Sequence, residues 1–145
     1  IHIDNNEIVG KHKGLSYYTI GQRRGLDIGG TEGRCYVVGK NIEKNILYVA
    51  IGDNSDALIS DSAVIENVNL FNDKVNKCTA KFRYRQEEEP VEVEYLSDTE
   101  VLVKYPQGIK SVTPGQACVF YNEEECLGGG IIKEVRKNNE KLWYL

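Results

Sequence analysis

Residues 91–105 read VEVEYLSDTEVLVKY, and this stretch sets the expectation for the whole chain. Two short runs rich in Val and Tyr, residues 91–96 and 100–105, are separated by polar residues 97–99. Runs of this length and composition are typical of β-strands joined by a turn. Helical periodicity is almost absent elsewhere in the sequence, so we predict an all-β protein.

Further runs of the same kind lie on both sides of this stretch. Before it, residues 34–40 and 45–51 indicate a hairpin with residues 41–44 as its turn, and residues 17–20 indicate another strand. The other strands that we predict are residues 63–71, 78–85, 117–121, 127–137 and 142–145. The glycines at 128–130 suggest a bulge or a tight barrel corner.

Residues 52–61 are polar and turn-rich except for residues 57–59, which is typical of a linker between two units. We therefore expect a boundary near Asp61, with a small β-domain in residues 1–61 and a second unit in residues 62–145. Six or seven short strands in the second unit predict a small closed barrel, because closure leaves few open strand edges.

The charge balance limits how the chain could bind nucleic acid. It has 145 residues, with 18 basic against 22 acidic residues and a net charge of −4. Indiscriminate electrostatic binding is therefore not expected, and any RNA contact must be local. No apolar run approaches the roughly 20 residues that cross a bilayer, so we expect a cytoplasmic protein without a membrane partner. The first residue is Ile1 and the sequence has no Met, so we expect a piece of a longer protein.

Catalytic and metal-binding motifs are not evident. The four cysteines lie far apart without a C-x-x-C pair, so we expect free and mostly buried thiols, no catalytic residue and no metal site. Glycine-rich phosphate-binding motifs are also missing, so we expect no cofactor in this chain. His12 lies between Lys11 and Lys13, and these residues fit a phosphate contact and a solvated basic loop about equally well.

The best local signal is KFRYRQ at residues 81–86. If residues 78–85 form one strand, Lys81, Arg83 and Arg85 share a face, while Phe82 and Tyr84 point towards the core. Such a basic stripe suits a phosphate backbone, because arginine offers a planar pair of donors to phosphate oxygens. The alternative that stays open is a solvated outer face, paired with the nearby glutamates 87–89.

Several strings resemble the tRNA-specific 2-thiouridylase (MnmA/TrmU) family. They are GKHKG at residues 10–14, YTIGQRRGL at 18–26, IGG at 28–30, KFRYRQ at 81–86, VTPGQA at 112–117, VFY at 119–121 and CLGGGII at 126–132. They follow the family pattern in order over about residues 8–132. The chain departs from this pattern at Cys35, where the family often has Pro, and around residues 70–71, where it often has Trp.

The resemblance implies the central β-domain and the C-terminal, translation-factor-like β-barrel of a three-part enzyme. That enzyme adenylates the wobble uridine of tRNA with ATP and Mg, and then delivers persulfide sulfur through two catalytic cysteines. The ATP-pyrophosphatase domain and both cysteines would precede Ile1, so this chain alone is expected to be inactive. The implied partners are the tRNA anticodon stem-loop region and a persulfide sulfur-donor protein, with a monomer expected.

The resemblance also assigns contacts with tRNA. It implies that Arg83, Tyr84 and Gln116 touch the tRNA, and it favours the RNA reading for Lys81 and Arg85 in the same stripe. Two other readings compete with this one: a non-enzymatic RNA-binding β-barrel of translation-factor type, and a split barrel that binds a flavin. A yellow colour on purification would favour the flavin-binding reading.

Overall fold

The computed structural model describes residues 1, 8, 10–24, 26, 35–51, 56–70, 76–83, 86–123 and 125–145. The structure is almost entirely β, as the sequence predicted. It divides into two compact units, of which the first comprises Ile1–Leu58 with Trp143–Leu145, and the second comprises Ile59–Leu142. No helix in the described part of the chain is long and apolar enough to cross a membrane.

The first unit is built around one antiparallel hairpin of β1 (Cys35–Asn41) and β2 (Ile46–Ile51). This confirms the predicted hairpin within the described residues. Val37, Val38 and Val49 are almost completely buried and form its core. The end of the chain belongs to the same unit, because the Tyr144 hydroxyl donates a hydrogen bond to the carbonyl of Ala57 at 2.6 Å.

The strand predicted at residues 17–20 is wrong. A short 3-10 helix, η1 (Leu15–Tyr17), is followed by irregular backbone. Gly14 and Gly21 have φ angles of 131° and 92°, which interrupt an extended path on both sides of the segment. The segment then pairs with β1 through the backbone hydrogen bonds Gly21 N to Val37 O at 2.8 Å and Val37 N to Gln22 O at 3.0 Å.

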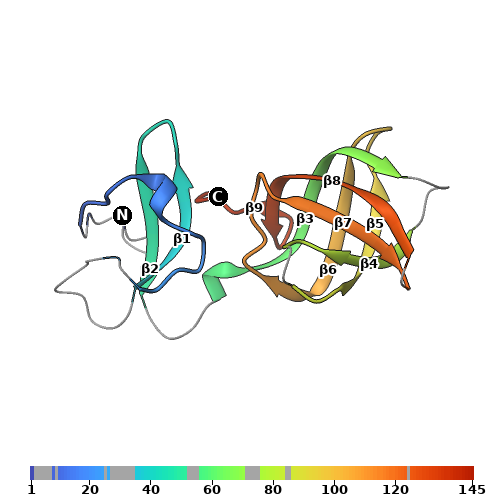
Figure 1. The fold of residues 1–145 in the computed structure, drawn as a ribbon, viewed down its shortest axis with the longest axis horizontal. Helices are drawn as coiled ribbons and strands as arrows, with labels where there is room; N and C mark the ends of the chain where they lie inside the picture. Colours follow the sequence, from blue (N-terminus) through green and yellow to red (C-terminus); the bar gives the residue numbers. More distant parts are fainter. Residues whose placement is uncertain are drawn as a thin grey trace. The chain divides into compact units, whose positions relative to one another are not determined.

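The second unit is a closed barrel of six antiparallel strands (Figure 1). In spatial order, β3 is followed by β6, β5, β4, β7 and β8, and pairing of β8 with β3 closes the ring. The bounds are β3 (Ile59–Leu70), β4 (Lys77–Lys81), β5 (Glu89–Tyr95), β6 (Val101–Lys110), β7 (Ala117–Asn122) and β8 (Glu125–Lys137). A short strand, β9 (Glu140–Lys141), extends the sheet beside β8.

Alternation of side chains builds the barrel interior. Along β5, buried Val91 and Val93 alternate with exposed glutamates, and at the start of β6 the residues at every second position, from Val101 to Tyr105, are buried. Phe82, Tyr105 and Phe120 are the largest side chains in the interior, with exposed fractions of 0%, 0% and 1%. The rings of Phe82 and Tyr105 lie 5.1 Å apart between centroids.

Two strand ends differ from the prediction for local reasons. β6 continues to Lys110 because residues 105–108 bulge opposite Asp61, with φ 82° at Gly108. The last strand is β9 and not residues 142–145. Asn138 and Asn139 have φ angles of 54° and 66°, and this pair makes the tight two-residue turn from β8 into β9.

The bulge or corner predicted at residues 128–130 is confirmed. Here β8 lies between β3 and β7, and its pairing slips with both strands. A Cβ atom at Gly129 would lie 2.5 Å from the carbonyl oxygen of Cys118, and one at Gly130 would lie 2.6 Å from that of Glu66. Only glycine lets the three backbones approach this closely.

Candidate nucleic-acid interface

One end of the barrel gathers two connections that are far apart in the sequence. β4 and β7 are antiparallel and pair Lys81 with Val119, so β4 ends where β7 begins. The β4–β5 connection at residues 82–88 and the β6–β7 connection at residues 111–116 therefore lie at the same end of the barrel. We call this the Arg83 end.

The basic stripe does not form in the way that strand alternation predicted. β4 ends at Lys81, and residues 82 and 83 form a bend, so the shared strand face does not continue to Arg83. Phe82 is buried as expected. Tyr84 and Arg85 lie outside the described residues. The backbone nitrogen of Gln86 donates to the carbonyl of Arg83 at 3.2 Å, which turns the chain back towards β5.

Lys81 is half-buried at the end of β4. Its Nζ lies 5.6 Å from the ring centroid of Tyr121 on the neighbouring strand, within the range of a cation–π contact. Within the described part of the chain, no ion pair joins Lys81 to a carboxylate. The positive charge of Lys81 thus lies beside an aromatic ring at the end of β4.

Arg83 is half-buried in the bend, and its position is set by the residue before it. The Phe82 ring packs on Tyr105, and the Tyr105 hydroxyl lies 2.7 Å from the Ser60 hydroxyl in the barrel core. Burial raises the pKa of Tyr105, because its phenolate would lose water there. This buried chain of contacts fixes the backbone from which Arg83 projects.

Gln116 approaches the same end from the other connection. It is exposed, and its backbone carbonyl accepts a hydrogen bond from Ile132 N at 2.9 Å. Its backbone nitrogen donates to Thr113 O at 3.3 Å, which closes a turn across Pro114 and Gly115. These two hydrogen bonds hold the backbone of Gln116 in place, so its side-chain amide extends from a fixed backbone position.

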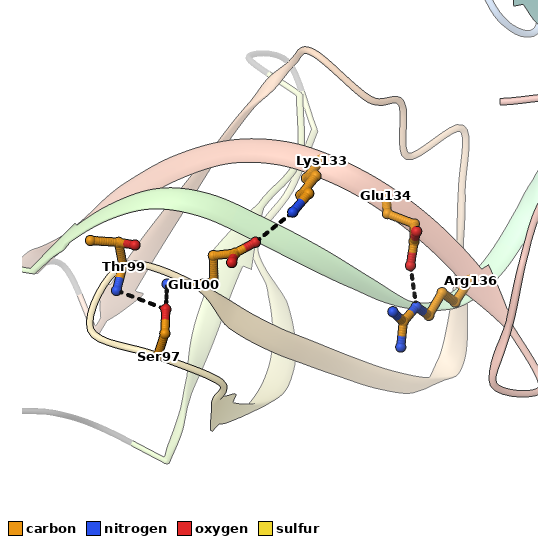
Figure 2. Close-up of polar contacts among 6 residues, drawn as sticks. All are labelled: Ser97, Thr99, Glu100, Lys133, Glu134 and Arg136. Atoms are coloured by element: carbon orange, nitrogen blue, oxygen red, sulfur yellow. Dashed lines mark hydrogen bonds and ion pairs between the residues drawn. The ribbon is translucent and has the colours of Figure 1, made fainter.

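Some basic side chains on the barrel wall have acidic partners, and Figure 2 shows two of these pairs. Lys133 on β8 donates to Glu100 at 2.9 Å, and Arg136 pairs with Glu134 two residues away on the same strand. The glutamates of residues 87–89 are partly engaged, because Thr79 Oγ1 donates to Glu88 at 3.1 Å.

The triple glycine of β8 does not form a phosphate-binding loop. The triple glycine of β8 is packed against the backbones of β3 and β7 and lies within a strand, so it cannot wrap around phosphates. Among the described residues, no group of three His, Cys, Asp or Glu side chains could hold a metal ion.

The cysteines are free, but they differ in burial. Cys35 and Cys118 are buried, Cys78 is half-buried and Cys126 is exposed. Burial raises the pKa of the Cys78 thiol to about 11 and also raises that of Cys118. Thiols of this kind are poor nucleophiles near neutral pH.

Sequence reasoning missed some of these residues. The contact of Lys81 with Tyr121 depends on the pairing of β4 with β7, which are separated by two other strands in the chain. Gln86 was not assigned a role, yet its Oε1 is buried without a hydrogen-bond partner among the described residues. No local sequence signal could have identified either feature.

Two family models match most of the chain. The tRNA methyl transferase PRC-barrel domain matches residues 1–51, and the aminomethyltransferase beta-barrel domain matches residues 60–132. The chain is also similar to proteins named tRNA-specific 2-thiouridylase MnmA. It is 48% identical to the protein of Bacillus subtilis over 97% of this chain. It is 47% identical to the protein of Mycoplasmopsis synoviae over 100% of this chain. It is 50% identical to tRNA-specific 2-thiouridylase MnmA 2 of Geobacillus kaustophilus over 97% of the chain. In each case the chain spans 39% of the relative's length.

Proposed function

Since this chain belongs to the tRNA-specific 2-thiouridylase family, we propose that it is the tRNA-binding portion of an enzyme that thiolates the wobble uridine of tRNA. The observation that carries this proposal is the Arg83 end, where the end of β4 and two connections place Lys81, Arg83 and Gln116 at the same end of the barrel. In this proposal, the Arg83 end contacts the anticodon stem-loop region of the tRNA.

The side chains at the Arg83 end supply complementary contacts. Arg83 offers a planar set of donors that suits two phosphate oxygens, and Lys81 adds a point charge. Gln116 supplies a neutral amide that can donate and accept hydrogen bonds at a sugar or a base edge. Tyr84 and Arg85 belong to the same proposed surface.

The chemistry of the reaction is assigned elsewhere in the parent protein. ATP with Mg activates the uridine there, and a persulfide-carrying partner protein supplies the sulfur. The buried or half-buried thiols of Cys78 and Cys118 have raised pKa values, which does not favour a role in sulfur transfer. We place the protein in the cytoplasm as a monomer.

A two-part assay tests this division of labour. The 145-residue chain should shift an unmodified tRNA transcript in a gel at low ionic strength, but it should neither release AMP from ATP nor thiolate the tRNA. The full-length parent protein should do all three. AMP formation by the pure chain, or failure of the chain to bind tRNA at any salt concentration, would contradict the proposal.

A further inference from the structure

Residues 10–24 of the first unit form a surface loop with a marked charge bias. Lys11, Lys13, Arg23 and Arg24 lie in this segment, which contains no acidic residue. The whole chain has a net charge of −4, so this concentration of positive charge is local. We call residues 10–24 the basic loop.

His12 anchors the first half of the basic loop. Its Nδ1 accepts a hydrogen bond from Gly14 N at 3.0 Å, so Nε2 carries the hydrogen and donates to Asn45 O at 2.9 Å. Both ring nitrogens are therefore used within the protein. The flanking Lys11 and Lys13 are exposed.

Gln22 anchors the second half. Its side-chain oxygen accepts from Thr19 N at 3.0 Å, and its amide nitrogen donates to Arg24 O at 2.8 Å. The backbone of the loop is thus held in one shape by side chains and by its two hydrogen bonds with β1. A loop held in this way loses little conformational entropy when it binds a partner.

The side chains that this loop presents suit a nucleic acid. Tyr17 is 75% exposed, and its ring lies directly beside Gly14, where a Cβ would be 3.2 Å from Tyr17 Cδ2. The guanidinium of Arg23 lies over the Tyr36 ring at 4.8 Å from the centroid, and Arg24 is exposed. A loop that carries both an exposed aromatic ring and exposed cations has the groups that bind unpaired bases and their phosphates.

We propose that the basic loop is a second RNA-binding surface, separate in sequence from the Arg83 end. Arg24 and Lys11 contact phosphates, and Tyr17 stacks on an unpaired base. This inference rests on the proposed function for its RNA, which is the same tRNA. A purely acidic protein partner would satisfy the cations but would give the exposed ring no base to stack on.

The test is a titration of the full 145-residue chain with a labelled, unmodified tRNA transcript at several salt concentrations. Arg24→Ala should weaken binding about tenfold and lower the slope of log affinity against log salt by about 0.7 to 0.9, because one phosphate contact is lost. Tyr17→Leu should also weaken binding about tenfold, but with an unchanged slope, because stacking carries no charge. Tyr17→Phe should bind like the unchanged chain.

Lys77→Ala is the matched control, because Lys77 is an exposed lysine at the start of β4, the end of that strand opposite Lys81. It should leave the affinity unchanged. If Arg24→Ala alone weakens binding while Tyr17→Leu does not, the loop only attracts polyanions and the inference fails. Unchanged affinity for both variants also overturns it. If Arg83→Ala still weakens binding in that case, the proposed function survives.

Discussion

Tyr105 and Ser60 form the one hydrogen bond between two fully buried side chains that the described core contains. Tyr105→Phe keeps the aromatic ring but leaves the Ser60 hydroxyl buried and unpaired. We expect this substitution to cost about 1–3 kcal/mol of unfolding free energy, and the added change Ser60→Ala to restore part of that loss. Urea denaturation of the three variants measures both effects. A double variant that is the least stable of the three would contradict this account of the core.

Cys78 provides a test through pH. Its pKa is raised from 9.0 to about 11 by burial, so the folded protein holds the neutral thiol where an unfolded chain would already ionise it. The contribution of the neutral Cys78 thiol to the unfolding free energy is therefore fully present below pH 9 and is lost as the pH rises towards 11. At pH 8 we expect iodoacetamide to label the exposed Cys126 well before Cys78. Mass spectrometry of digested protein measures the order, and equal labelling rates would contradict the burial of Cys78.

At the scale of elements, the triple glycine of β8 should be the least tolerant part of the barrel. Gly129→Ala places a methyl group against the Cys118 carbonyl, so we expect a loss of about 3 kcal/mol or more. Gly115→Ala is the control, because nothing lies within 4 Å of its Cβ position and only its φ of 90° is unfavourable. That variant should lose about 1–2 kcal/mol. Equal urea midpoints for the two variants would show that the strands separate without strain.

The elements that the sequence predicted well are those with regular alternation. β5 and the start of β6 follow directly from buried valines at every second residue, and the β1–β2 hairpin follows from two apolar runs and a polar turn. The prediction failed where a few backbone angles decide the path. Gly14 and Gly21 turn residues 14–21 away from a strand, and the Asn138–Asn139 turn creates β9.

The candidate site was predictable only in part. The residue types at 81–86 indicated a phosphate-binding segment, but the sequence placed Arg83 in a strand that in fact ends at Lys81. The closeness of this segment to Gln116 depends on the pairing of β4 with β7, and neither local propensity nor alternation specifies which strands become neighbours.

At the scale of the whole molecule, an excess of acidic residues makes binding to RNA depend on a few positions. A chain with net charge −4 gains little from general attraction to a polyanion, so single substitutions at the contacts should have visible effects. Binding by the chain alone should be weak and strongly reduced by salt. The same lack of broad positive charge favours specific binding, because such a surface does not bind every nucleic acid equally.

The central claim is that the Arg83 end of the barrel holds tRNA, and its most direct test is a salt titration of tRNA binding by three full-length variants of the chain. Arg83→Ala should lose about 1–3 kcal/mol of binding free energy and about one ion of salt slope. Gln116→Ala should lose only about 0.5–1.5 kcal/mol with an unchanged slope, because its hydrogen bond is neutral. Lys77→Ala should bind like the unchanged chain. Unchanged affinity for folded Arg83→Ala and Gln116→Ala would contradict the claim and leave the Arg83 end as an ordinary solvated surface.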